Sequence, residues 1–151
     1  MHPQESQEPR EFSTAREAVD QLGLIDFIKA HKALIYEKIK ECDKRVEDAK
    51  KEGKGEFYGD MTFIATCLPL AAGIVHVGST LDKFKEAQNS LGKGLGLLDP
   101  TSVLSALTLL YLVQTGWENN KEDETWKRIR QRVVRFLESQ GPSPSQESTS
   151  L

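Results

Sequence analysis

The sequence has only two cysteines and no recognisable metal-binding motif. Cys42 and Cys67 lie far apart in the chain, so they lack the two-residue spacing of a zinc or redox site. We therefore expect both thiols to be reduced and buried, although spacing alone does not exclude a single long-range disulfide. His31 and His76 have no second ligand at helical spacing, and no metal site is expected.

Signatures of nucleotide binding and hydrolysis are also missing. The segment Gly73–Thr80 approaches a phosphate-binding loop but lacks the lysine that reaches the phosphates. The glycine-rich segment Gly92–Gly96 follows an expected helix, whereas a dinucleotide-binding loop follows a strand. No Gly-x-Ser-x-Gly motif is present, and the acidic residues are spread along polar faces. We predict that the protein is not an enzyme, uses no cofactor and has no small-molecule substrate.

The sequence has little excess of either charge. Its 20 lysines and arginines and 23 acidic residues give a net charge of -3, which provides no general attraction to nucleic acid. No apolar stretch follows a basic start near residue 1, so no secretory signal peptide is predicted. We expect an intracellular protein, either cytoplasmic or peripheral to a membrane, that does not bind nucleic acid.

Length and composition indicate one globular domain with disordered ends. A chain of 151 residues, 38% of them hydrophobic, can bury a core. Residues 1–12 and the serine- and proline-rich residues 139–151 have too few apolar side chains to offset their ordering entropy. We predict disordered tails there and a helical domain at 13–138. The final Thr149-Ser150-Leu151 matches a pattern that peptide-binding grooves accept, although chance explains such a match more often.

The fold class predicted from the residue pattern is all-α. No useful length of sequence alternates with the period of a strand, and helical spacing recurs throughout. We expect a single-domain bundle of about five to seven helices. The two long uncharged stretches, Met61–Val75 and Pro100–Gly116, predict two strongly apolar central helices. Both are shorter than the roughly 20 apolar residues that span a bilayer, so shelter in the protein core is the favoured interpretation.

Local signals predict where the helices begin and end. Thr14 and Glu17 have the spacing of a capping box, which should open the first helix, and Gly23 should end or kink it. After the glycine-rich turn at 53–55, Gly59 should break the chain and Asp60 should cap the next helix.

Two prolines and two glycines mark the later boundaries. Pro69 should kink or split the helix that contains it, because it lacks a backbone donor. A helix from Ser79 should end at Gly92, and Asp99-Pro100 should start the next one, which should end near Gly116. The last helix is expected to begin near Asn119 or Asn120.

Between residues 25 and 49, apolar side chains recur at spacings of three and four. This pattern predicts one long amphipathic helix, whose seam is interrupted by Lys32, so packing inside the protein is favoured over a coiled coil. The same helix is the first candidate for contact with a protein partner or with a second copy of the chain. The candidate interaction residues are Ile28, Ile35, Ile39 and Val46.

The last predicted helix is amphipathic and basic. Its inward face should be formed by four apolar residues, namely Trp126, Ile129, Val133 and Phe136. Such a helix can contact an anionic membrane, but the acidic residues in its first turn oppose this, and a docked helix with a solvated basic face is favoured. The candidate membrane or anion contacts are Lys127, Arg128, Arg130, Arg132 and Arg135.

One family resemblance involves the C-terminal half of the chain. The run Leu91-Gly92-Lys93-Gly94-Leu95-Gly96-Leu97-Leu98-Asp99-Pro100, followed by an apolar helix and a helix ending Arg135-Phe136-Leu137, resembles the helical N-terminal domains of fungal NACHT/STAND-type signalling receptors. The chain departs from that family by its aspartate before Pro100 and by having no nucleotide-binding region after it. The resemblance implies a stand-alone helical module in immune-type or incompatibility signalling, with no catalytic residues.

These patterns lead to two functional hypotheses. The first is a non-enzymatic α-helical protein-interaction module, with signalling as its context. The alternative is a membrane-associating helical bundle, in which an apolar helical hairpin becomes exposed under some conditions.

Overall fold

The computed structural model describes residues 10–95 and 100–140, and every regular element in these ranges is helical. The elements are α2 (Arg10–Leu22), α3 (Ile25–Ala30), α4 (Lys32–Gly53), α5 (Glu56–Thr62), the π-helical turn η1 (Phe63–Cys67), α6 (Leu68–Gly78), α7 (Leu81–Leu95), α8 (Pro100–Asn119) and α9 (Glu124–Gln140). Because α5, η1 and α6 form one continuous helix, the described part of the chain is a bundle of seven helices. The all-α prediction is confirmed.

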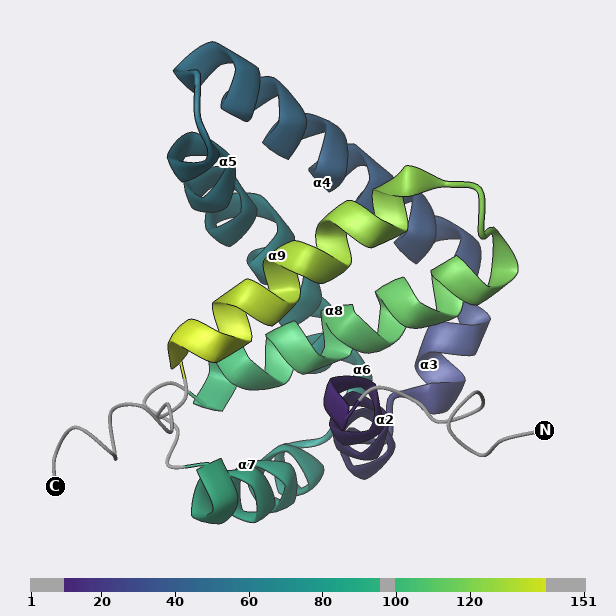
Figure 1. The fold of residues 1–151 in the computed structure, drawn as a ribbon. Coiled ribbons are helices and arrows are strands. Elements are labelled where there is room, and N and C mark those ends of the chain that lie inside the picture. Colours follow the sequence, from purple (N-terminus) through teal and green to yellow (C-terminus); the bar gives the residue numbers. More distant parts are fainter. Residues whose placement is uncertain (1–9, 96–99, 141–151) are drawn as a thin grey trace, which may run out of the picture.

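Helix α8 is the centre of the bundle. It packs against α2, α6 and α9, and α9 lies alongside it in the view of Figure 1. Leu104 and Leu110 have no exposed surface, and nearly every residue from Val103 to Val113 is buried. A helix that is apolar on all sides needs neighbours on all sides, which explains this central position.

The boundaries of α8 agree with the sequence at the start and differ at the end. The helix begins at Pro100 as predicted, but it continues through Gly116 to Asn119. Gly116 is buried because the Trp126 ring of α9 packs directly on it, and a Cβ atom at this position would lie 2.9 Å from the ring. This glycine therefore serves a close helix contact rather than a helix end.

The second apolar helix is less central than the sequence predicted. Phe63 and Cys67 are buried, but Met61 is 50% exposed and Ile64 is 43% exposed. Only 33% of the most apolar 18-residue window of the helix Glu56–Gly78 is buried. One face of this helix packs on α4 and α8, and the other face is open to solvent.

The first helix begins earlier than its capping box suggested. Helix α2 starts at Arg10 rather than near Thr14, and Phe12 is 3% exposed with its ring 6.0 Å from that of Tyr111 in α8. This tertiary contact extends the helix into the predicted tail, and α9 likewise continues through Ser139. The remaining tail predictions, for 1–9 and 141–151, lie outside the described residues.

The predicted helix from Ile25 to Ala49 is interrupted at His31. This residue has φ -117° and ψ 21°, and it separates the short α3 from α4. Phe27 of α3 lies against Gly78 at the end of α6, whereas α4 packs against α5, η1 and α9. The break before α3 is confirmed at Gly23, whose φ of +74° is favourable only for glycine.

Two glycines expected to break helices lie inside them. Helix α5 starts at Glu56 and passes through Gly59, where a Cβ atom would lie 3.1 Å from the Arg132 guanidinium. Close approach of this side chain explains the glycine, and Asp60 is not a cap. Helix α7 likewise runs past Gly92 to Leu95. The kink or split expected at Pro69 is not seen as a break in the chain, because the helix continues from Glu56 to Gly78. Pro69 instead lies in the first turn of α6, directly after the π turn Phe63–Cys67.

The last helix begins at Glu124 rather than near Asn119. Asp123 precedes it, and its Oδ1 accepts a hydrogen bond of 3.0 Å from the Thr125 backbone N–H, as in an N-cap. The predicted inward face is confirmed, since Trp126, Ile129 and Val133 are buried and Phe136 is partly buried against the core.

Replacing Leu110 by alanine should lower the free energy of unfolding by about 3 kcal/mol, because it removes a fully buried side chain and leaves a cavity. Leu34→Ala is the matched control, since Leu34 is 55% exposed and its truncation should cost under about 0.5 kcal/mol. Urea unfolding measures both. Equal losses would contradict the central position of α8.

Candidate interaction surface

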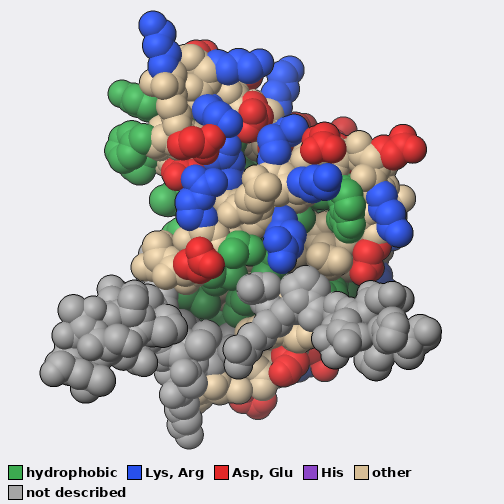
Figure 2. All heavy atoms as spheres, in the orientation of Figure 1, with side chains coloured by type: hydrophobic (Ala, Val, Ile, Leu, Met, Phe, Trp, Pro, Cys, Tyr) green, Lys and Arg blue, Asp and Glu red, His purple; other side chains and the backbone are tan. Residues whose placement is uncertain are grey.

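Four large apolar side chains lie exposed along α5 and the start of η1. Phe57 is 69% exposed, and the others are between 43% and 55% exposed. Their spacing of three and four residues places them along one side of the helix. Figure 2 shows hydrophobic side chains gathered over α5, at the upper left of the molecule. We call this group the α5 patch, and it consists of Phe57, Tyr58, Met61 and Ile64.

The surface that continues from the patch along the helix carries no formal charge. No Asp, Glu, Lys or Arg occurs from Met61 to Leu81. Beyond the α5 patch, Val77 and Leu81 are 70% and 67% exposed. Among the described residues, the helix Glu56–Gly78 is the one long and apolar enough to cross a bilayer by length and composition. Exposed apolar side chains gathered in a patch mark sites of contact with proteins or membranes.

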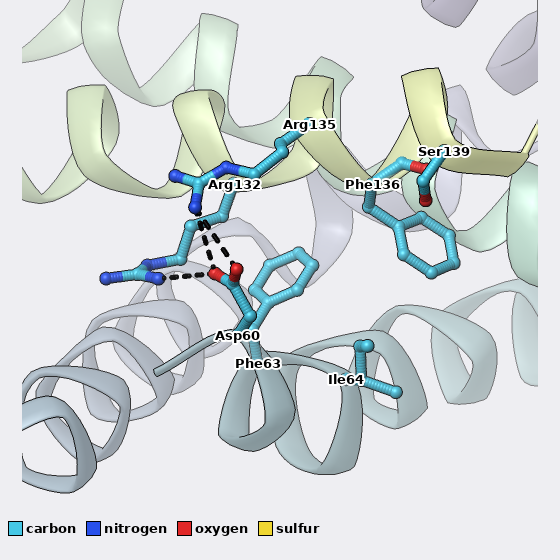
Figure 3. A pocket seen from close by; sticks show the side chains of 7 residues that line it. All are labelled: Asp60, Phe63, Ile64, Arg132, Arg135, Phe136 and Ser139. Atoms are coloured by element: carbon cyan, nitrogen blue, oxygen red, sulfur yellow. Dashed lines mark hydrogen bonds and ion pairs between the residues drawn. The ribbon is translucent and has the colours of Figure 1, made fainter. Parts of the chain in front are cut away.

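A pocket of about 170 Å³ borders the α5 patch, between α5–η1 and α9. It has a charged end and an apolar end (Figure 3). At the charged end Asp60 lies between two arginines of α9, and at the apolar end Ile64 and Phe136 face each other. The lining residues are Asp60, Phe63, Ile64, Arg132, Arg135, Phe136 and Ser139.

Arg132 connects three helices beside this pocket. Its side chain is 5% exposed, and its guanidinium group donates to Asp60 at 2.9 Å, to Glu47 at 3.2 Å and to Glu56 at 3.3 Å. Its Nε has no hydrogen-bond partner among the described residues. The carboxylates come from α4 and α5, so one buried cation attaches α9 to both helices.

A second arginine makes a shorter contact between α9 and α4. Arg128 donates from Nη2 to Asp43 Oδ2 at 2.6 Å and from Nε to Oδ1 at 3.2 Å. Such a two-point contact is strong because both partners are ionised. The hydrogen bond that Arg128 donates to Asp43, which is 3% exposed, is the largest cause that raises the pKa of Arg128.

The predicted basic face of α9 is mostly engaged within the protein. Arg128 and Arg132 form the contacts above, and Arg135 binds Asp60 at 3.1 Å. Lys127 lies over the Trp117 ring at 5.3 Å, and Arg130 lines a cavity of about 250 Å³ beside the same ring. Arg128, Arg132 and Arg135 are thus paired with carboxylates, whereas Lys127 remains 54% exposed, and contact of this face with a membrane or an anion stays a prediction.

The residues predicted for partner contact lie elsewhere in the structure. Ile28 and Ile35 are each 5% exposed, and Ile39 and Val46 have no exposed surface. All four belong to the core of the bundle. A partner reaches them only if the bundle opens, whereas the α5 patch is exposed in the closed bundle.

Sequence reasoning missed the α5 patch and the carboxylates that hold α9. Phe57 and Tyr58 stand next to glycines and charged residues, and two adjacent aromatics in such a polar stretch were the available signal. Asp43 lies on the charged side of α4 as read from the sequence, and nothing local distinguishes it from its exposed neighbours.

No protein-family model, curated protein or solved structure matches this chain. Within the described residues, no three His, Cys, Asp or Glu side chains gather in a metal-binding arrangement. The functional argument therefore depends on the surface itself.

Replacing Arg132 by methionine should lower the free energy of unfolding by about 3 kcal/mol, because it leaves carboxylates of α4 and α5 without their buried cation. Arg135→Met is the matched control on the same helix. Its side chain is 49% exposed, and its loss should cost under about 1 kcal/mol. Urea unfolding of both variants is the measurement, and a greater loss from Arg135→Met would contradict the assigned role of Arg132.

Acid should weaken the fold through two carboxylates. The pKa of Glu56 is lowered chiefly by Lys50, and the pKa of Asp123 chiefly by Lys40. A carboxyl group whose pKa is lower in the folded state stabilises that state above its unfolded pKa, and this contribution is lost as the pH falls through the folded value. The losses should begin near pH 4.5 for Glu56 and near pH 3.8 for Asp123.

The pH dependence can be measured as the urea midpoint between neutral and acid pH. Glu56→Gln and Asp123→Asn should each flatten the acid limb of the wild-type curve. Because both residues are partly exposed, added salt should reduce the difference. An acid limb that neither variant changes would contradict the assignment.

Proposed function

We propose that the protein is a non-enzymatic helical interaction module whose contact surface is the α5 patch. The observation that supports this is the exposure of Phe57, Tyr58, Met61 and Ile64 together on a helix that is firmly docked on its opposite face. Aromatic residues and methionine are enriched in the centres of protein interfaces, whereas charged residues are depleted there.

The occupant that we propose for the patch is a second copy of this chain. The patch has no charge of its own, so two copies can oppose it without repulsion, as a twofold contact requires. Exposed charged residues of both signs, including Lys51, Glu52 and Lys54, lie just before the patch in the sequence. A mixed rim of this kind is compatible with self-pairing.

Gly73 supports a contact that extends along α6. It lies inside the helix, where glycine costs about 1 kcal/mol relative to alanine. Gly59 in the same helix is explained by the adjacent Arg132, whereas a Cβ atom at Gly73 would meet no atom within 4 Å. A helix from another molecule that approaches closely gives this glycine a physical reason.

The signalling context of the proposal comes from the resemblance of residues 91–100 and the following helices to fungal NACHT/STAND-type receptor domains. In such a setting a small helical module acts by assembling with other copies or proteins, which agrees with the proposed use of the α5 patch.

The test of this function is the molar mass of the full chain in solution, measured by light scattering over a range of concentrations. We expect a concentration-dependent dimer that Ile64→Glu and Met61→Glu convert to monomer. Leu34→Glu is the control, because Leu34 is exposed to a similar extent on α4 and its replacement should leave the dimer intact. A chain that is monomeric throughout, or a dimer insensitive to both patch variants, would contradict the proposal.

Membrane association is the second candidate function. The specific observation in its favour is the 23-residue length of the helix Glu56–Gly78 together with its 33% burial over the most apolar window. Its exposed face offers the apolar surface that an interfacial helix inserts between lipid head groups. Flotation with vesicles containing anionic lipid, at neutral and acid pH, distinguishes the two candidates: wild-type protein that floats while Ile64→Glu does not would favour the membrane, and no flotation at either pH would exclude it.

A further inference from the structure

The two cysteines, distant in the sequence, meet at the contact between α4 and the π turn. Cys42 is on α4 and Cys67 is the last residue of η1. Both thiols are free and buried, with exposed fractions of 9% for Cys42 and 1% for Cys67. Helix α4 packs directly on η1, and the two thiols lie close enough that a hydrogen bond between them affects the pKa of both. The pair therefore brings together the two sulfurs that a disulfide requires.

The two thiols differ in their access to solvent. A groove of about 420 Å³ runs between α4 and the η1–α6 segment, and Cys42 is part of its lining whereas Cys67 is not. The hydroxyl of Thr66, which also lines the groove, lies 3.8 Å from the Cys67 sulfur. The groove is lined by Lys38, Glu41, Cys42, Arg45, Ala65, Thr66, Pro69 and Leu70. A small solute in the groove thus meets Cys42 first.

The surroundings of the pair also favour different protonation states. The hydrogen bond from Cys67 lowers the pKa of Cys42, and the charge of Arg45 acts in the same direction. The hydrogen bond with Cys42 and burial raise the pKa of Cys67. The thiolate is the reactive form of cysteine, so the accessible sulfur is the better nucleophile and the enclosed sulfur retains its proton.

We propose that Cys42 and Cys67 form a redox-sensitive pair in which Cys42 reacts with a hydroperoxide in the groove and Cys67 then closes an intramolecular disulfide. In the first step the Cys42 thiolate attacks the terminal peroxide oxygen, the O–O bond breaks, and the departing alkoxide or hydroxide takes up a proton. Cys42 becomes a sulfenic acid. In the second step the Cys67 sulfur attacks the Cys42 sulfur, and the displaced hydroxide leaves as water with the proton of the Cys67 thiol.

The product would connect α4 covalently to the helix Glu56–Gly78. That helix carries the α5 patch, so oxidation would restrict its movement relative to the bundle. The inference about the thiols does not depend on the proposed function, because it uses only the Cys42–Cys67 contact and the groove above it.

The test treats the full chain with hydrogen peroxide and then measures its mass and free thiols after unfolding. We expect a monomer that has lost two hydrogen atoms and both thiols, and that regains them on addition of dithiothreitol. Thermal unfolding should shift to a higher temperature in the oxidised form, because the cross-link restricts the unfolded chain. Retention of both thiols at a peroxide concentration that oxidises the urea-unfolded chain would overturn the proposal, as would disulfides formed only between molecules.

Single variants distinguish the roles of the two sulfurs. Cys67→Ala should accumulate a sulfenic acid at Cys42 that dimedone traps, because the second thiol is missing. Cys42→Ala should leave Cys67 reduced under the same treatment, since its sulfur is enclosed. Oxidation of Cys67 in Cys42→Ala at the wild-type rate would contradict the proposed order. The wild-type mass measurement tests the pair independently if either variant folds poorly.

Discussion

The structure depends on covering helix α8 on every side. Its side chains are apolar around the whole circumference, and water must be excluded from all of them. Helices α2, α6 and α9 each contact it, and small residues such as Gly116 allow these neighbours to approach closely. This requirement also places α4 and α5. Both helices pack against the π turn and contact α9, which itself covers α8.

The helix Glu56–Gly78 has a different arrangement, and this difference is the basis of the functional argument. Its inner face contributes Phe63 and Cys67 to the core, while Met61 and Ile64 remain in solvent. Buried ion pairs around Arg132 hold α5 to α9 with directional contacts. The exposed apolar side chains therefore belong to a fixed surface, and a fixed surface needs little ordering when it binds.

The sequence was sufficient for features decided by local physics. The start of α8 at Pro100 and the positive φ at Gly23 follow from the chemistry of single residues. The sequence was not sufficient for features that tertiary contacts determine. Gly59 is a poor helix residue by local propensity, yet it lies inside α5 with Arg132 packed against it. Ile64 resembles a core residue, although only one side of its helix has neighbours. Local patterns show how apolar a segment is, and they do not show how many helices surround it.

The central claim is that the bundle covers only one face of the uncharged helix and leaves the other in water. Paramagnetic line broadening of methyl groups by a soluble relaxation agent, in dilute monomeric protein, tests it directly. We expect strong broadening of the Met61 and Ile64 methyl signals and almost none for Leu110 and Ile39, in line with their burial. Protection of Ile64 equal to that of Leu110 would contradict the account.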